Sequence, residues 1–163
     1  MPSASRLSWR RKVQSPRQVA AAVRRLQRRG RRVVFTNGCF DLLHVGHATI
    51  LEKAKRLGDV LVVGINSDRS VRRLSKGPER PIVPQRDRAL MLAALSSVDY
   101  VTVFNDATPY RLISLLRPDI LVKGADWALQ GVVGRDLVKR VVRLPLVRGR
   151  STTDLVQRLR RCG

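Results

Sequence analysis

One apolar run, Val60-Leu61-Val62-Val63-Gly64-Ile65, most constrains how this chain folds. It is far too short to cross a membrane as a helix, and its residues are apolar on both sides of the strand that they predict. A strand with two apolar faces is typical of a parallel sheet that helices cover on both sides. We therefore expect an α/β fold rather than a sheet with one face in water.

Strand and helix patterns alternate from end to end of the chain, which predicts a three-layer, Rossmann-like parallel sheet. A single domain is expected over residues 15–163, after a basic flexible tail over residues 1–14. Besides the run above, strands are predicted at 33–35, 98–104, 120–122 and 141–144. Helices are predicted at 16–29, 45–57, 68–74, 85–95, 109–117, 132–140 and 155–161.

The formal net charge of +21 favours anionic substrates and non-specific polyanions as partners. The basic residues are spread along the chain and aromatic residues are few, so we expect no specific nucleic-acid partner. No transmembrane pattern or secretory signal is visible, which predicts no membrane insertion. Cys39 and Cys162 match no metal spacing, and they favour a cytoplasmic protein with free thiols.

Two histidines fall where the first strand of the sheet turns into a helix. Asn37-Gly38 ends the strand and a helical apolar pattern begins near Val45, so His44 and His47 lie at the helix start. Free backbone N–H groups and the partial positive charge of a helix N-terminus suit an anion. Imidazoles there donate hydrogen bonds to phosphate oxygens, and Gly46 allows a phosphate chain to approach closely. This stretch predicts a phosphate site.

Polar residues also follow the other strands at their carboxyl ends, where open α/β sheets bind ligands. Lys123 follows the strand at 120–122, and we expect it to line a nucleotide pocket rather than to be a solvated lysine. Asn66 and Asp68 follow the strand at 60–65 and are candidates for sugar hydroxyls, with turn and capping roles as the alternative. These positions extend the predicted site along one edge of the sheet.

Further candidates lie in the loops and helix starts around that edge. Arg88 and Lys76 are candidates for substrate phosphates, with a surface charge as the alternative reading. Trp127 is equally consistent with a contact to the base and with core packing. Ser151-Thr152-Thr153-Asp154 has the pattern of a capping box, and its helix N-terminus offers a second set of free donors to phosphates.

Several ordered motifs resemble the nucleotidyltransferase superfamily that includes the cytidylyltransferases. The first is residues 36–47, TNGCFDLLHVGH, and the others lie at 63–68, 80–84, 98–101, 118–124 and 149–153. The resemblance covers about residues 16–161 and is strongest to bacterial D-glycero-β-D-manno-heptose 1-phosphate adenylyltransferases, the nucleotidylyl half of ADP-heptose synthase. In two places the chain departs from the pattern: segment 132–144 is shorter, and Ala125 stands where a second glycine is frequent.

The resemblance implies an enzyme of ADP-heptose biosynthesis, which transfers AMP from ATP to heptose 1-phosphate and releases pyrophosphate. Together with the residue patterns it assigns catalytic roles to His44, His47 and Lys123. The expected nucleotide-binding residues are Thr36, Asn37, Gly38, Phe40, His44, Gly46, His47, Arg88, Lys123, Gly124, Asp126, Ser151, Thr152 and Thr153. The expected sugar-phosphate-binding residues are Asp41, Asn66, Asp68 and Lys76.

The same resemblance implies Mg²⁺ bound mainly through the phosphates of ATP, without a metal site made by protein side chains. It also implies a homodimer, with a separate sugar kinase and a phosphatase as pathway neighbours. Two alternatives stay open at this point. One is a CTP-dependent cytidylyltransferase acting on glycerol 3-phosphate or a similar small phosphate, and the other is a non-catalytic basic module that binds nucleotide or RNA.

Overall fold

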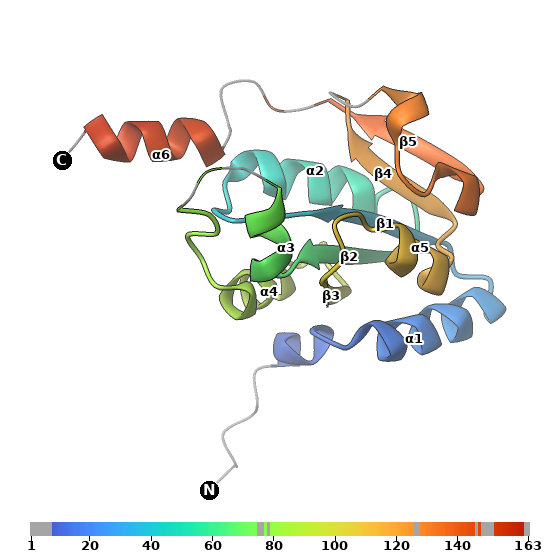
Figure 1. The fold of residues 1–163 in the computed structure, drawn as a ribbon. Helices are drawn as coiled ribbons and strands as arrows, with labels where there is room; N and C mark the ends of the chain where they lie inside the picture. The colour runs from blue at the N-terminus through green and yellow to red at the C-terminus, as the bar shows by residue number, and fades with distance from the viewer. Residues whose placement is uncertain are drawn as a thin grey trace, which may run out of the picture.

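The computed structural model describes residues 8–74, 77, 79–125, 128–145, 147 and 152–161. They form a five-stranded parallel sheet flanked by helices, which confirms the predicted three-layer α/β fold (Figure 1). The strands stand side by side in the order β3-β2-β1-β4-β5. Their bounds are β1 (Val33–Gly38), β2 (Val60–Asn66), β3 (Tyr100–Phe104), β4 (Ile120–Gly124) and β5 (Arg140–Leu144).

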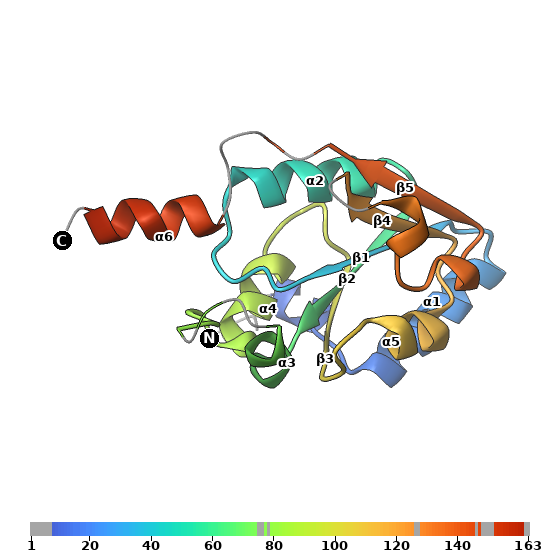
Figure 2. The same cartoon turned by 45° about the horizontal axis from the view of Figure 1, so that its top comes forward.

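The α-helices found among the described residues are α1 (Pro16–Arg28), α2 (Val45–Lys55), α3 (Asp68–Arg73), α4 (Gln85–Ala93), α5 (Tyr110–Leu116) and α6 (Thr152–Arg161). Short 3₁₀ turns occur at η1 (Ser8–Lys12), η2 (Leu129–Gly131) and η3 (Arg135–Leu137). Helix α6 projects away from the sheet in both ribbon views (Figures 1 and 2). The rest of the helices pack against the sheet.

Strand β2 is buried on both faces, as its apolar run predicted, because the two faces contribute to two different cores. Leu61, Val63 and Ile65 pack in one cluster with residues of α2 and α4. Val60 and Val62 pack in the other cluster with residues of α1 and α5. Figure 2 shows α2 and α4 on one side of the sheet and α1 and α5 on the other. Burial on both faces explains why this strand has no polar side chain before Asn66.

The N-terminal segment differs from the expected tail over residues 1–14. Residues 8–14 pack onto the domain: the N–H of Gln14 donates to the carbonyl oxygen of Val101 at 3.0 Å, and Lys12 Nζ donates to that of Leu95 at 3.1 Å. Trp9 and Val13 pack against the core cluster that includes α4. These hydrogen bonds and the two apolar side chains hold residues 8–14 on the domain, although most residues of the segment are polar or basic.

Other boundaries shift by a few residues. The predicted helix at 132–140 is only the 3₁₀ turn η3, which Gly134 precedes in the left-handed conformation at φ 86°. Helix α5 begins at Tyr110, after Pro109, and its N-terminus has no side-chain cap. Ser15 caps α1, and Gln18 completes a capping box with it.

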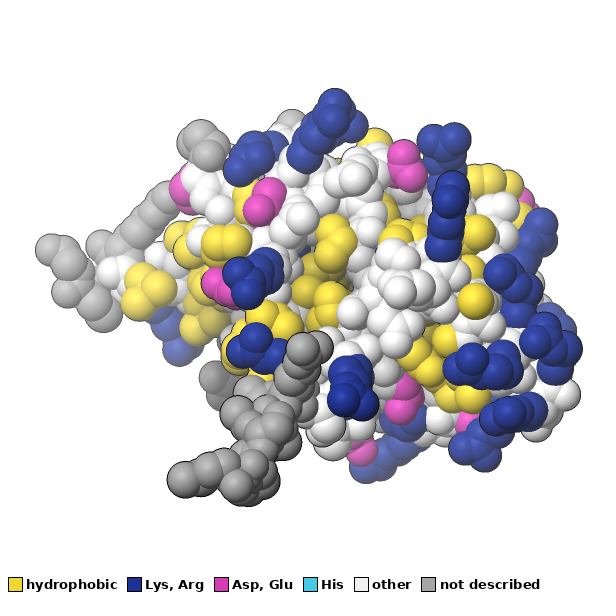
Figure 3. Space-filling view, turned by 90° about the horizontal axis from the view of Figure 1, so that it is seen from below, with side chains coloured by type: hydrophobic (Ala, Val, Ile, Leu, Met, Phe, Trp, Pro, Cys, Tyr) yellow, Lys and Arg dark blue, Asp and Glu magenta, His cyan; other side chains and the backbone are white. Residues whose placement is uncertain are grey.

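The surface agrees with a dispersed positive charge. Figure 3 shows the side of the molecule on which α1 lies, where Lys and Arg side chains are spread among hydrophobic and acidic ones. No helix in the described part of the chain is long and apolar enough to cross a membrane. The absence of a nucleic-acid partner stays a prediction.

The amino ends of β1 and β4 are joined through the carboxylate of Asp119, of whose side chain only 16% is exposed. It accepts from the N–H of Val33 at 3.0 Å, from Gln27 Nε2 at 3.2 Å and from Lys139 Nζ at 3.0 Å. Burial opposes its ionisation, but these donors outweigh burial and hold the pKa of Asp119 below 3.8. This stabilisation is complete above the unfolded pKa and is lost as the pH falls through the lower folded pKa.

We expect Asp119→Ala to lower the free energy of unfolding by about 1–3 kcal/mol at pH 7, because the half-buried donors lose their acceptor. The difference from the unmodified protein should shrink in acid, below about pH 4. Urea unfolding at pH 7 and pH 3.5 measures both. Asp136→Ala removes an exposed carboxylate, whose hydrogen bond from the Tyr110 hydroxyl at 2.9 Å is open to solvent, and should change stability by less than about 1 kcal/mol. Equal effects of the two substitutions would contradict this account of Asp119.

Candidate active site

The strand order reverses between β1 and β4, and this switch point is where doubly wound sheets bind ligands. Thr36 pairs in register with Val122, so the next residues, Asn37 and Lys123, stand opposite each other at the carboxyl ends of the strands. Lys123 Nζ donates a hydrogen bond to Asn37 Oδ1 across this point. Burial lowers the pKa of Lys123 from 10.5 to about 8. The structure therefore places a desolvated cation at the switch point.

The two histidines lie together at the N-terminus of α2. His44 is the N-cap residue, and its Nδ1 accepts from the N–H of Gly46 at 3.1 Å, which leaves Nε2 as the proton-bearing nitrogen of the neutral ring. The His44 and His47 rings stack with their centroids 3.9 Å apart at an interplanar angle of 27°. The sequence spacing thus brings both imidazoles to one helix start, as predicted.

The loop between β1 and α2 depends on a backbone turn at Phe40, which has a φ of 48°. This turn buries the Phe40 ring, whose centroid lies 5.1 Å from that of His47. A Cβ on Gly38 would approach the Phe40 ring to 3.1 Å, so only glycine fits there without displacing the ring. Thr36 is buried, and its Oγ1 donates to the carbonyl oxygen of Val122 at 3.1 Å. Its expected contact with phosphates stays a prediction.

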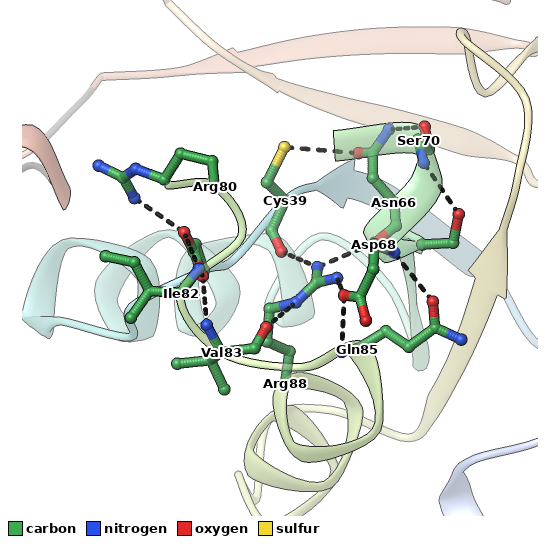
Figure 4. Close-up of polar contacts among 11 residues, drawn as sticks. Cys39, Asn66, Asp68, Ser70, Arg80, Ile82, Val83, Gln85 and Arg88 are labelled. Atoms are coloured by element: carbon green, nitrogen blue, oxygen red, sulfur yellow. Dashed lines mark hydrogen bonds and ion pairs between the residues drawn. The ribbon is translucent and has the colours of Figure 1, made fainter. Parts of the chain in front are cut away.

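Arg88 is the most completely enclosed charge near the site, with a side chain that is 0% exposed. Its Nη1 donates to the carbonyl oxygens of Cys39 at 2.5 Å and Asn66 at 2.9 Å, and its Nε donates to that of Val83 at 2.9 Å (Figure 4). Its Nη2 forms an ion pair with Asp68 Oδ1 at 2.8 Å. Every nitrogen of this guanidinium therefore donates to a protein acceptor, and a contact with nucleotide stays a prediction.

Asn66 and Asp68 belong to the same buried network. Asn66 Nδ2 donates to Ser70 Oγ at 2.9 Å. Asp68 exchanges two hydrogen bonds with Gln85, since its N–H donates to Gln85 Oε1 at 2.9 Å and its Oδ1 accepts from the N–H of Gln85 at 2.8 Å. These bonds tie α3 to the start of α4, and the expected contacts with sugar hydroxyls stay predictions.

Asp41 holds the loop that leads into α4. Its Oδ1 accepts from the N–H groups of Ile82 and Val83 at 2.9 Å each, and its Oδ2 accepts from Arg80 Nη1 at 2.9 Å (Figure 4). Burial opposes ionisation of this carboxyl, but the donated hydrogen bonds prevail and hold the pKa of Asp41 below 3.8. Asp41 thus joins two loops, and its expected contact with the sugar phosphate stays a prediction.

The final helix reaches the same loop. Thr152, the first residue of α6, donates through Oγ1 to the carbonyl oxygen of Leu42 at 3.4 Å. Gly124 ends β4 beside Lys123. Three expected site residues, Lys76, Asp126 and Ser151, lie outside the described residues, and so do Trp127 and the side chain of Thr153.

No cluster of three or more His, Cys, Asp or Glu side chains that could hold a metal ion occurs in the described part of the chain. The donors gathered at the described site are imidazoles, an ammonium group and helix N–H groups, which suit phosphate oxygens rather than a cation. Such a donor set fits a magnesium ion carried on the phosphates of a nucleotide.

A parallel sheet with a cation at its switch point and histidines at a helix N-terminus has the donors that suit the phosphates of a nucleotide. The sequence matches the model of the Cytidylyltransferase-like family over residues 35–158, and the chain belongs to this family. The predicted superfamily and enzyme class are thereby confirmed.

Curated relatives carry the name "Bifunctional protein HldE". The protein from a Nitratiruptor species is 58% identical over 137 residues, which are 84% of this chain and 29% of that protein. The protein from Syntrophotalea carbinolica is 60% identical over 137 residues, covering 82% and 28%. The chain thus spans less than a third of these relatives. A solved structure, the lipopolysaccharide core biosynthesis protein from Thermoplasma volcanium, matches with a TM-score of 0.61 at 27% identity and covers 72% of this chain and 98% of that one.

We expect Arg88→Met to lower the free energy of unfolding by about 3–5 kcal/mol, because Asp68 and three carbonyl groups lose a buried charged donor at nearly constant volume. Arg86→Met, on the exposed side of the same helix, serves as the control and should change stability by less than about 0.5 kcal/mol. Denaturant unfolding of both variants measures the difference. An Arg88 variant as stable as its control would show that the network is not structural.

Proposed function

We propose that the protein transfers AMP from ATP to D-glycero-β-D-manno-heptose 1-phosphate, which gives ADP-heptose and pyrophosphate. The observation that carries this proposal is the stacked pair His44 and His47 at the N-terminus of α2, beside the switch-point cation Lys123. The motifs shared with heptose 1-phosphate adenylyltransferases, and the high identity to the HldE proteins, support the choice of sugar.

The chemistry asks for alignment and charge stabilisation rather than a strong base. An oxygen of the sugar phosphate, already anionic at neutral pH, attacks the α-phosphorus of ATP and forms the new P–O bond. The bond from the α-phosphorus to its β-bridging oxygen breaks, and pyrophosphate leaves with the electron pair. His44 and His47 donate hydrogen bonds to the transferred phosphoryl group, while Lys123 and the N–H groups of α2 offset the added negative charge. Magnesium carried on the nucleotide would supply positive charge to the leaving pyrophosphate.

The family match supports a second candidate, a cytidylyltransferase that uses CTP and glycerol 3-phosphate or a similar small phosphate. Its site needs the same histidines and the same helix N-terminus, so the donors described above do not separate the two. Our proposal extends to a cytoplasmic homodimer, with a separate sugar kinase and a phosphatase acting on neighbouring metabolites, and these parts rest on resemblance.

Pyrophosphate release distinguishes the candidates. With Mg²⁺, we expect release from ATP plus heptose 1-phosphate at a kcat/KM at least about tenfold above that from CTP plus glycerol 3-phosphate. Release with the CTP pair alone would remove the heptose assignment. No release with either pair, together with salt-sensitive RNA binding, would favour the non-catalytic module.

We expect His44→Ala and His47→Ala each to lower kcat by about 10²–10³-fold, the typical loss for one donor to a transition-state oxygen. Lys53→Ala, on the exposed surface of the same helix, is the matched control and should retain full activity. Circular dichroism verifies that the variants are folded. Unchanged turnover in both histidine variants would refute the proposed mechanism.

We expect kcat/KM to fall as the pH rises through about 8, because the Lys123 ammonium loses its proton there and with it the charge that offsets the phosphates. Lys123→Arg keeps its charge at all these pH values, so its profile should lack this limb. Since the unfolded chain holds this proton up to 10.5, Lys123 should also make folding stability rise between pH 8 and 10.5. A limb near pH 8 that persists in Lys123→Arg would belong to another group.

A further inference from the structure

Two arginines lie beside the loop that leads to the histidines, and they differ in what their donors do. Sequence patterns single out Arg88 as the candidate for phosphate, yet all three of its nitrogens donate to protein acceptors. Arg80 received no role, although it opens one of the motifs that carry the family resemblance, residues 80–84. The contacts of Arg80 indicate that the two arginines have different roles.

The Arg80 side chain is only 11% exposed, so its charge is largely removed from water. Its Nη1 is paired with Asp41 Oδ2 at 2.9 Å. Its Nε is buried and has no acceptor among the described residues. A buried donor without an acceptor is costly, and the planar fork of an arginine side chain can bind two oxygens of an anion such as a phosphate.

Asp41 fixes where this guanidinium sits. The same carboxylate accepts from the N–H groups of Ile82 and Val83, which anchors the Arg80 loop to the segment just before His44. Figure 4 shows the Arg80 guanidinium pointing away from the Arg88 network. The carboxylate of Asp41 is shared between Arg80 and the N–H groups of Ile82 and Val83. Its negative charge therefore offsets the positive charge of Arg80 only in part, and the guanidinium still attracts a second anion.

The loop of Arg80 joins α3 to α4 and therefore belongs to the β2 side of the sheet. Lys123 stands at the end of β4, across β1 from that side. An in-line transfer needs the incoming phosphate and the leaving pyrophosphate on opposite sides of the α-phosphorus. A cation on each side of β1 matches that requirement.

We propose that Arg80, rather than Arg88, binds the phosphate of the acceptor substrate. The proposal deepens the proposed function and rests on it for the identity of the acceptor. Arg80 donates through Nε and Nη2 to two phosphate oxygens, while its Nη1 stays on Asp41. The positive charge of Arg80 offsets the repulsion between the acceptor phosphate and ATP.

Initial rates of Arg80→Gln test the assignment. We expect the KM for heptose 1-phosphate to rise about 10- to 100-fold, the loss typical of hydrogen bonds to a charged group, while the KM for ATP changes by less than about threefold. Arg80→Lys should recover part of the acceptor affinity. Arg86→Gln, an exposed arginine six residues on, is the control and should leave both KM values unchanged.

A merely structural role gives a different pattern. If Arg80 only holds Asp41 and its loop, the KM values for both substrates and kcat should deteriorate together, the melting temperature should fall, and lysine should not restore the acceptor KM selectively. That pattern, or an unchanged acceptor KM in folded Arg80→Gln, would overturn the inference. A rise confined to the KM for ATP would also overturn it, because it would move Arg80 to the nucleotide.

Calorimetric titration separates this inference from the proposed function. Heptose 1-phosphate and glycerol 3-phosphate are titrated in turn into the unmodified protein and into Arg80→Gln. For whichever acceptor the unmodified protein binds, we expect the Kd of the variant to be at least tenfold higher. Preference for glycerol 3-phosphate would refute the heptose assignment while leaving the role of Arg80 intact. Equal affinity of the two proteins, or binding of neither acceptor by the unmodified protein, would refute the role of Arg80.

Discussion

The buried guanidinium of Arg88 is the interaction on which the geometry of the site depends. From α4 it reaches the carbonyl of Cys39 after β1, the carbonyl of Asn66 at the end of β2, and the carboxylate of Asp68 in α3. This charged donor joins separate chain segments, and each lost bond would leave a buried polar atom unpaired. The loop before His44 is thereby tied to the sheet.

Further contacts hold in place the loops and side chains that we propose to bind phosphate. Asp41 ties the Arg80 loop to the same segment, and Thr152 brings the start of α6 to Leu42. The N-cap bond from Gly46 orients the His44 ring, and His47 stacks upon it. Donors held in advance at fixed positions stabilise charge in a transition state without reorganisation, so the proposed adenylyl transfer needs no strong base.

Much of this arrangement could be predicted from the sequence because it depends on local patterns. The two-faced apolar strand at Val60–Ile65 implied the buried parallel sheet, and the spacing of His44 and His47 after a glycine turn implied their place at a helix start. The roles of Arg80 and Arg88 could not be separated in the same way. In a chain rich in arginine, a pattern does not reveal which guanidinium points inward, since that depends on carbonyl groups far away in sequence.

The central claim is that a phosphate oxygen attacks the α-phosphorus of ATP and not the γ-phosphorus. Phosphorus NMR of a reaction with ATP, Mg²⁺ and heptose 1-phosphate tests it directly. We expect the sugar monoester signal to be replaced by two coupled signals of a pyrophosphate diester, with an equal amount of free pyrophosphate. Formation of ADP with a phosphorylated sugar, or of inorganic phosphate alone, would contradict it.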